Sequence, residues 1–126
     1  MALILDSGAL IAVDRANREV TARLLKAHLD GIPVRTSAAV VAQVWRDGSR
    51  QARLARLVNT TDERTLDTAA ARRIGLLLGA AGMADVVDAS LIDLAEQGDE
   101  ILTSDPDDIA RLAHASGKQL FVTPVS

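Results

Sequence analysis

The chain has 126 residues, of which 48% are hydrophobic and 25% charged, and its formal net charge is −3. This length predicts a single domain covering residues 1–126, and the composition excludes an intrinsically disordered chain. The absence of cysteine excludes disulfides and zinc–thiolate sites, and the negative charge excludes a polycation that coats nucleic acid. No apolar stretch approaches the ~20 residues of a membrane span, and no secretory signal is recognisable, so we expect a cytoplasmic protein without membrane contact.

The hydrophobic pattern predicts strands that alternate with helices. An apolar run at 2–5 indicates a buried strand, followed by a turn at Asp6, Ser7 and Gly8 and then a short helix. The next elements in chain order are a helix from the N-cap Asn17 to Gly31, a strand over 32–36, a helix capped by Ser37, a helix from about Ser49 to Val58, a short edge strand within 60–67, a helix over 68–81, a helix from Asp85 to Gln97, a strand over 100–105, a helix from Pro106 to Gly117, and a last strand over 119–125. This alternation predicts a three-layer α/β/α sandwich with a mostly parallel central sheet.

Four aspartates are predicted to meet at one edge of this sheet. Asp6 follows the first strand and Asp105 ends the strand over 100–105, so both lie where open α/β sheets bind their ligands. Asp85 and Asp88 are three residues apart at the start of a helix, which places them on one face of its first turn. Carboxylates so close together repel one another, and oxygen-rich sites of this kind suit Mg²⁺ or Mn²⁺.

Helix capping is the alternative role of each of these acids, because aspartate is favoured at the N-cap and in the first turn. This role fits Asp105 best, since Pro106 follows it, and it fits Asp6 least, since Asp6 ends a buried strand. The remaining acids of this region are expected to be solvated surface charge, and they are Asp93, Glu96, Asp99, Glu100, Asp107 and Asp108.

Basic residues gather in another part of the chain. Arg46, Arg50 and Arg53 follow i, i+4, i+7 spacing, which predicts a basic stripe along one helix face. Because guanidinium groups bind phosphates and carboxylates in a forked geometry, this stripe is a candidate contact for RNA or for an acidic protein partner. A solvated helix face is the alternative.

Other chemistries have little support in the sequence. His28 and His114 lack a serine or cysteine partner motif, which argues against a hydrolytic triad, and no glycine-rich phosphate-binding motif occurs. With Trp45 and Phe121 as the only aromatic residues, binding of single strands mainly by base stacking is not expected. A phosphoacceptor receiver domain shares the architecture but needs a pair of acids after its first strand, where Asp6 stands alone.

Four segments, in order, carry a resemblance to a known family. They are ILDSGALIA at 4–12, SAAVVAQVWRDGSRQARLARL at 37–57, ADVVDASLIDLAEQGDEILTSDPDDI at 84–109, and the final strand. Through them the chain resembles the PIN-domain ribonucleases, and among these the VapC-type toxins of bacterial toxin–antitoxin pairs. The resemblance covers essentially the whole chain and implies a PIN-like form of the predicted sandwich.

The resemblance also implies roles for particular residues. Asp6, Asp88 and Asp105 match the family's catalytic, metal-binding acids, and Asp85 matches an additional acid that often lies one turn earlier. One position departs from the family, which usually has a glutamate in the helix after the second strand where this chain has Gln43. A glutamine offers a neutral oxygen to a metal ion but removes one negative charge, so we expect weaker or altered metal binding.

The implied function is a cytoplasmic endoribonuclease that uses Mg²⁺ or Mn²⁺ to cleave RNA and that a VapB-type antitoxin inhibits by laying a C-terminal segment across the acidic groove. Such toxins are commonly homodimers, and the apolar helix around 74–81 is a candidate interface, with a wholly internal core helix as the alternative. A second possible function is a catalytically weakened PIN-like module that binds RNA or the antitoxin, because Gln43 replaces the usual glutamate.

Overall fold

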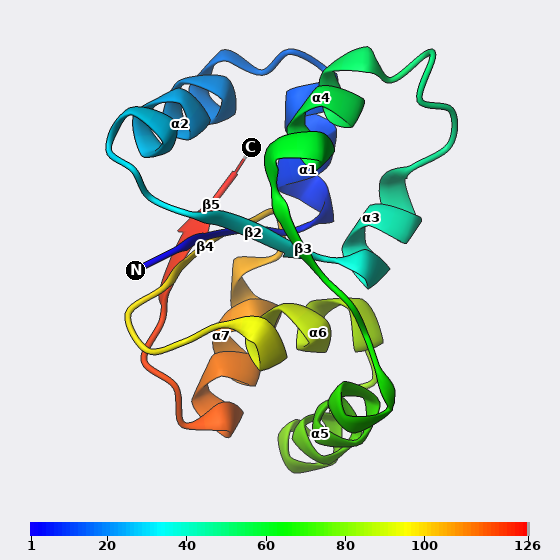
Figure 1. Cartoon of the computed structure of the whole chain (residues 1–126). Coiled ribbons are helices and arrows are strands. Elements are labelled where there is room, and N and C mark those ends of the chain that lie inside the picture. Colours follow the sequence, from blue (N-terminus) through cyan, green and yellow to red (C-terminus); the bar gives the residue numbers. More distant parts are fainter. Residues whose placement is uncertain (126) are drawn as a thin grey trace.

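The computed structural model describes residues 1–125, and its centre is a sheet of five strands (Figure 1). The strands are β1 (Leu3–Leu5), β2 (Val34–Ser37), β3 (Asp62–Arg64), β4 (Glu100–Thr103) and β5 (Phe121–Pro124), in the spatial order β3-β2-β1-β4-β5. Every pair of neighbouring strands is parallel. The mostly parallel sheet expected from the sequence is therefore confirmed, and β3 is the predicted short edge strand.

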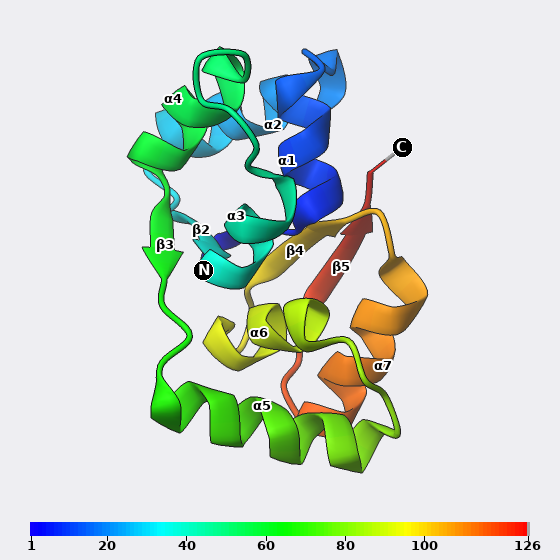
Figure 2. The same cartoon turned by 90° about the vertical axis from the view of Figure 1, so that its right-hand side faces the viewer.

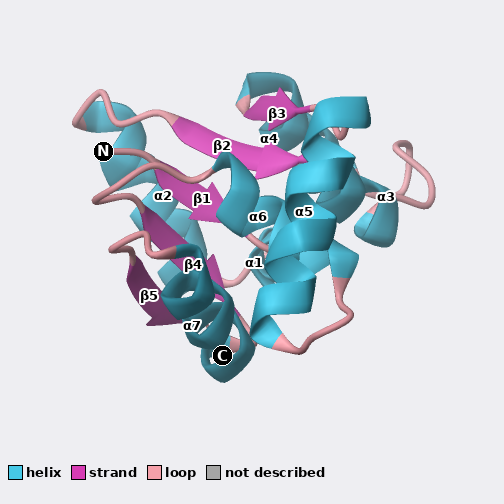
Figure 3. Cartoon of the chain, turned by 90° about the horizontal axis from the view of Figure 1, so that it is seen from below, coloured by secondary structure: helices cyan, strands magenta, loops and turns pink. Residues whose placement is uncertain are grey.

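Helices cover both faces of the sheet. They are α1 (Ser7–Asp14), α2 (Arg18–Leu29), α3 (Ala38–Val44), α4 (Ala52–Thr60), α5 (Thr68–Ala81), α6 (Val86–Leu94) and α7 (Pro106–Ser116). In Figure 1, α1, α2 and α4 lie above the sheet and α5, α6 and α7 lie below it, and Figure 3 views this lower layer from outside. The predicted three-layer α/β/α sandwich is confirmed. No single helix within residues 1–125 is long and apolar enough to cross a membrane.

Local capping explains where several helices begin. The predicted caps Asn17 and Ser37 both accept a hydrogen bond from the backbone N–H three residues on, each over 3.1 Å. Pro106 opens α7 as expected. The turn predicted after the first strand is wrong, because the Asp6 side chain caps a helix that already begins at Ser7.

Two helix boundaries differ from the prediction. The helix expected from Ser49 begins only at Ala52, because the backbone N–H and the hydroxyl of Ser49 both donate to the carboxylate of Asp47 and hold a turn there. The helix expected to reach Gln97 ends at Leu94, and the ammonium group of Lys118 donates to the carbonyl oxygens of Ile92 and Asp93 in its last turn. In both places side chains form hydrogen bonds with backbone groups, and these bonds compete with the continuation of the helix.

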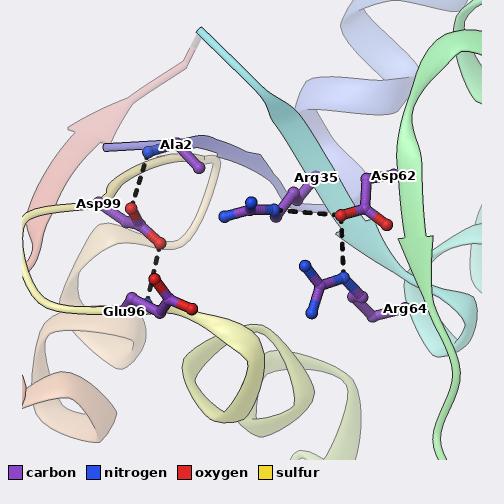
Figure 4. A network of polar contacts seen from close by, with 6 residues as sticks. All are labelled: Ala2, Arg35, Asp62, Arg64, Glu96 and Asp99. Atoms are coloured by element: carbon purple, nitrogen blue, oxygen red, sulfur yellow. Dashed lines mark hydrogen bonds and ion pairs between the residues drawn. The ribbon is translucent and has the colours of Figure 1, made fainter.

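Two polar networks connect segments that are distant in the sequence (Figure 4). Asp99 is buried and accepts hydrogen bonds from the backbone N–H groups of Ala2, over 2.7 Å, and of Glu96, over 2.9 Å. The expectation that Asp99 is solvated surface charge is wrong, because its carboxylate fastens the N-terminal end of β1 to the loop before β4. At the edge of the sheet formed by β3, Asp62 pairs with Arg35 of the neighbouring strand β2 and with Arg64.

Candidate metal centre

Three of the helices that begin at the carboxyl edge of the sheet have an aspartate at the N-cap position. Strands β1 and β4 are neighbours, so Asp6, which ends β1 and caps α1, lies near Asp105, which follows β4 and caps α7. Asp85 caps α6, which packs against α7. Figure 2 looks onto this side, where the first turns of α1, α6 and α7 surround the end of β4. The partial positive charge of helix N-termini favours acids at all three positions.

Asp6 is held by the backbone at both of its carboxylate oxygens. Oδ1 accepts from the N–H of Ala9 over 2.8 Å, and Oδ2 accepts from the N–H of Ser104 over 3.0 Å. The residue is only 2% exposed. The expectation that Asp6 is the acid with least to gain from capping is therefore wrong. It caps α1 and also bridges α1 to the turn between β4 and α7.

Asp88 is an acid of this site whose ionised form is clearly disfavoured by its surroundings. It is buried in the first turn of α6, its backbone N–H donates to Asp85 Oδ1 over 3.0 Å, and its own Oδ2 has no hydrogen-bond partner within residues 1–125. Its pKa is raised to about 7, first by burial and then by the negative charges of its neighbours, which are Asp85, Asp105, Asp6 and Asp108. A buried oxygen without a partner is costly, and a cation would offset that cost.

The carboxylate of Asp105 does not cap α7, although the residue stands at the N-cap of that helix. Its side chain makes no capping hydrogen bond, and its backbone N–H instead donates to the hydroxyl of Thr103 over 2.8 Å. Desolvation and the neighbouring carboxyl of Asp108 raise its pKa. The acid for which capping was the strongest alternative is thus one that does not cap.

Asp108 joins this group, which the sequence analysis did not foresee. One oxygen each from Asp88, Asp105 and Asp108 lie within 4.8 Å of one another. The expectation that Asp108 is solvated surface charge is wrong because it lies one helical turn after Asp105 and faces the same way. The signal was present in the sequence, since the three-residue spacing of Asp105 and Asp108 repeats that of Asp85 and Asp88.

The acidic cluster, defined as Asp6, Asp85, Asp88, Asp105 and Asp108, fits a hard divalent cation. All the potential metal ligands are oxygens, three of them are close enough to share one ion, and one buried oxygen has no partner among residues 1–125. The structure thus brings the four aspartates of the sequence prediction into one region and adds a fifth.

Gln43 lies on α3 with an exposed side chain. Helix α3 packs against both α1 and α6, the helices that carry Asp6 and Asp88. Position 43 is therefore on an element adjacent to the acidic cluster, and its role as a neutral ligand stays a prediction.

The predicted arginine stripe along one helix face is wrong in its geometry. Arg46 lies in the segment after α3, where its guanidinium donates to the carbonyl oxygen of Trp45 over 2.7 Å, and Arg50 lies in a turn with its guanidinium 3.7 Å from Asp47. Only Arg53 lies on α4. The turn that delays the start of α4 separates the three residues.

Arg53 contributes to a different basic surface. A cavity of about 510 Å³ between α1, α2 and α4 is lined by Val13, Ala16, Arg18, Thr21, Ala22, Leu25, Arg53 and Arg56. Apolar side chains and three guanidinium groups therefore share one hollow, which suits a partner with both apolar and acidic groups.

The apolar helix α5 faces the core on one side only. Ala70 and Ile74 are buried, and α5 packs against α6 and α7, whereas Leu76 is 78% exposed. The wholly internal alternative is therefore wrong for the face that carries Leu76, and the use of this face in a homodimer stays a prediction.

Comparisons with known proteins give a structural match. No protein-family model and no curated protein matches the sequence. Among solved structures, a chain in the crystal structure of VapBC2 from Rickettsia felis, bound to a DNA fragment from their promoter, superposes with a TM-score of 0.73. The match is 12% identical in sequence and covers 100% of both chains. The likeness spans both chains in full, so this chain shares the fold of that chain, in agreement with the α/β/α sandwich predicted from the sequence.

Proposed function

We propose that this chain is a VapC-type toxin, a metal-dependent endoribonuclease that cleaves RNA phosphodiester bonds and that a VapB-type antitoxin inhibits. The observation that carries the proposal is Asp88 Oδ2, a buried carboxylate oxygen that no group of the described chain bonds, beside Asp105 and Asp108. An isolated buried charge destabilises a fold, and a bound cation would offset the cost of burying this carboxylate. The full-length likeness to a chain of a VapBC2 structure supports the same function.

The acids of the cluster would hold Mg²⁺ or Mn²⁺ in two different ways. Asp88 and Asp105 have carboxylates that no capping bond occupies, and Asp108 adds a third. Asp6 and Asp85 each accept backbone N–H groups and keep further lone pairs for a cation or its water. When bound, the cation offsets the carboxylates and activates water for attack on the phosphodiester. In this scheme Asp6, Asp88 and Asp105 are the catalytic residues.

The partners follow from the same proposal. RNA is the substrate in the cytoplasm, and the antitoxin covers the acidic cluster. The cavity with Arg18, Arg53 and Arg56 offers a binding site for acidic groups of the antitoxin or for RNA phosphates. Arg46 and Arg50 are exposed in the segment before α4 and are further candidate contacts. The exposed face of α5 around Leu76 is the proposed homodimer contact.

The test is cleavage of a panel of total and transfer RNA by antitoxin-free protein in Mn²⁺ or Mg²⁺ against EDTA. Asp105→Asn and Asp107→Asn form a matched pair, because both lie at the start of α7 and only Asp105 belongs to the acidic cluster. We expect metal-dependent cutting that Asp105→Asn abolishes and Asp107→Asn retains. Cutting that persists in EDTA, or equal activity of the two variants, would refute the proposal.

Gln43 favours a second candidate function, a PIN-like module that binds RNA or antitoxin but cuts slowly. Its position on α3, adjacent to the helices of Asp6 and Asp88, makes a charge at residue 43 relevant to the cluster. Gln43→Glu should then raise both Mn²⁺ affinity and cleavage. Gln119→Glu, an exposed change of the same charge before β5, is the control. If Gln43→Glu matches that control, residue 43 does not limit activity.

A further inference from the structure

Gly8 lies in the first turn of α1, and its backbone does not require a glycine. Among the described residues, the glycines with a left-handed backbone are Gly31, Gly82, Gly98 and Gly117, so Gly8 is not one of them. Within a helix, glycine is ~1 kcal/mol less favourable than alanine. A glycine here therefore needs a reason in packing.

That reason is the close approach of Ser104. A Cβ placed on Gly8 would overlap both Oγ and Cβ of Ser104 and would lie 3.3 Å from Asp6 Oδ1. The hydroxyl of Ser104 could rotate away, but its Cβ is fixed to the backbone and cannot. Any side chain at position 8 must therefore displace the backbone of Ser104.

The backbone of Ser104 is also what orients Asp6. Its N–H donates to Asp6 Oδ2 over 3.0 Å, while Asp6 Oδ1 is held by α1 itself. Moving Ser104 would lengthen the one bond that ties Asp6 to the turn leading to Asp105. Ser104 is exposed, so this contact belongs to the rim of the acidic cluster and not to the hydrophobic core.

We propose that Gly8 is a positioning residue of the metal site, whose missing side chain lets Ser104 approach α1 and hold Asp6 at the angle the site requires. This inference rests on the proposed function, because it concerns the ligand geometry of that site. Substitution of a residue that orients a metal ligand without contacting the metal typically lowers the metal affinity 10–100-fold.

The test compares Gly8→Ala with its suppressor and with a matched control. Gly8→Ala introduces the overlap, and the double variant Gly8→Ala/Ser104→Gly removes the atoms that the new Cβ meets while keeping the N–H at 104. Gly75→Ala makes the same change in α5, where a Cβ meets nothing within 4 Å. Mn²⁺ affinity is measured by calorimetry on the intact chain, hydrogen exchange of the Ser104 amide by NMR without metal, and folding by thermal unfolding.

We expect Gly8→Ala to fold, to bind Mn²⁺ at least about tenfold more weakly than the unaltered protein, and to exchange the Ser104 amide faster. The double variant should restore both the Mn²⁺ affinity and the exchange rate. Gly75→Ala should change neither. Loss of thermal stability without loss of Mn²⁺ affinity would overturn the inference, and so would a double variant that stays as weak as Gly8→Ala. If the unaltered chain binds no Mn²⁺, the metal site of the proposed function fails, whereas unchanged Ser104 exchange in Gly8→Ala refutes the inference about Gly8 separately.

Discussion

Replacing Asp88 with asparagine should make the metal-free protein more stable, and more so at high pH. Asparagine has nearly the shape of aspartate but carries no charge, so it removes the cost of burying a charge at residue 88 and the repulsion between residue 88 and the other acids. The pKa of Asp88 is raised from 3.8 to about 7, with burial as the largest cause. A raised pKa in an acid means that the folded protein binds the proton more tightly than the unfolded chain does.

The sign and size of the effect on the free energy of unfolding follow from the difference between the folded and unfolded pKa of Asp88. Below about pH 4 Asp88 is protonated in both states and does not affect stability. Between this pH and pH 7 only the unfolded chain is ionised, so the free energy of unfolding decreases as the pH rises, and above pH 7 the loss is complete. At about 1.36 kcal/mol per pH unit, the raised pKa of Asp88 lowers the free energy of unfolding by ~4 kcal/mol at pH 8 and by roughly 1 to 2 kcal/mol at pH 5.

Urea unfolding in EDTA at pH 5 and pH 8 measures this directly. Asp88→Asn should gain ~4 kcal/mol over the unaltered protein at pH 8 and less than half of that at pH 5. Asp107→Asn, an exposed acid at the start of α7, serves as the control and should show little change at either pH. An equal gain at both pH values, or a loss at pH 8, would show that ionisation of Asp88 does not destabilise the fold.

Three further substitutions have definite expectations. Asp6→Asn should lower the free energy of unfolding by ~2 kcal/mol, because the new amide donor would face the N–H of Ser104. Urea unfolding measures this loss, and an unchanged free energy would mean that the hydrogen bond from Ser104 contributes nothing. Leu54→Ala should cost ~2 to 5 kcal/mol in the same assay, because Leu54 is fully buried in α4, and a smaller loss would indicate that the site collapses around the cavity. Leu76→Glu should leave stability unchanged and convert a dimer to a monomer in light scattering, whereas a dimer that persists would place the interface elsewhere.

Much of the fold is predictable because short-range chemistry and long-range packing agree. The apolar strands β1 and β4 lie side by side in the centre of the sheet, where parallel strands are buried. Asn17 and Ser37 cap helices in the structure as their residue types suggest. At these positions no distant contact opposes the local preference.

The failures of prediction come from contacts that a one-dimensional pattern does not contain. Asp99 is buried because its carboxylate accepts the N–H of Ala2, at the opposite end of the chain. The arginine stripe assumed a continuous helix, but the hydrogen bonds between Ser49 and Asp47 favour a turn over helix. Spacing predicts a common face only where the helix is already known to be continuous.

The roles of the site acids are hardest to derive from sequence, because capping and ligand binding use the same residue at the same place. Asp6 and Asp105 both stand at N-caps after parallel strands, yet only the side chain of Asp6 caps. The difference lies in the backbone, which is extended at Asp6 (φ −87°, ψ −178°), as a capping residue requires, but not at Asp105 (φ −131°, ψ 60°). Only the folded turn between β4 and α7 decides which carboxylate is free.

This division gives the two kinds of acid opposite effects on stability. Removing the charge of a capping acid such as Asp6 takes away a hydrogen bond, whereas removing that of Asp88 relieves the burial of a charge and its repulsion by the other acids. The raised pKa of Asp88 should also couple cation binding to pH, since Asp88 is protonated below about pH 7 and must ionise before it can bind. Mn²⁺ affinity should therefore increase by up to about tenfold per pH unit below pH 7 and level off above it, and calorimetry at pH 6, 7 and 8 would show whether it does. An affinity independent of pH would mean that Asp88 is not among the groups that hold the ion.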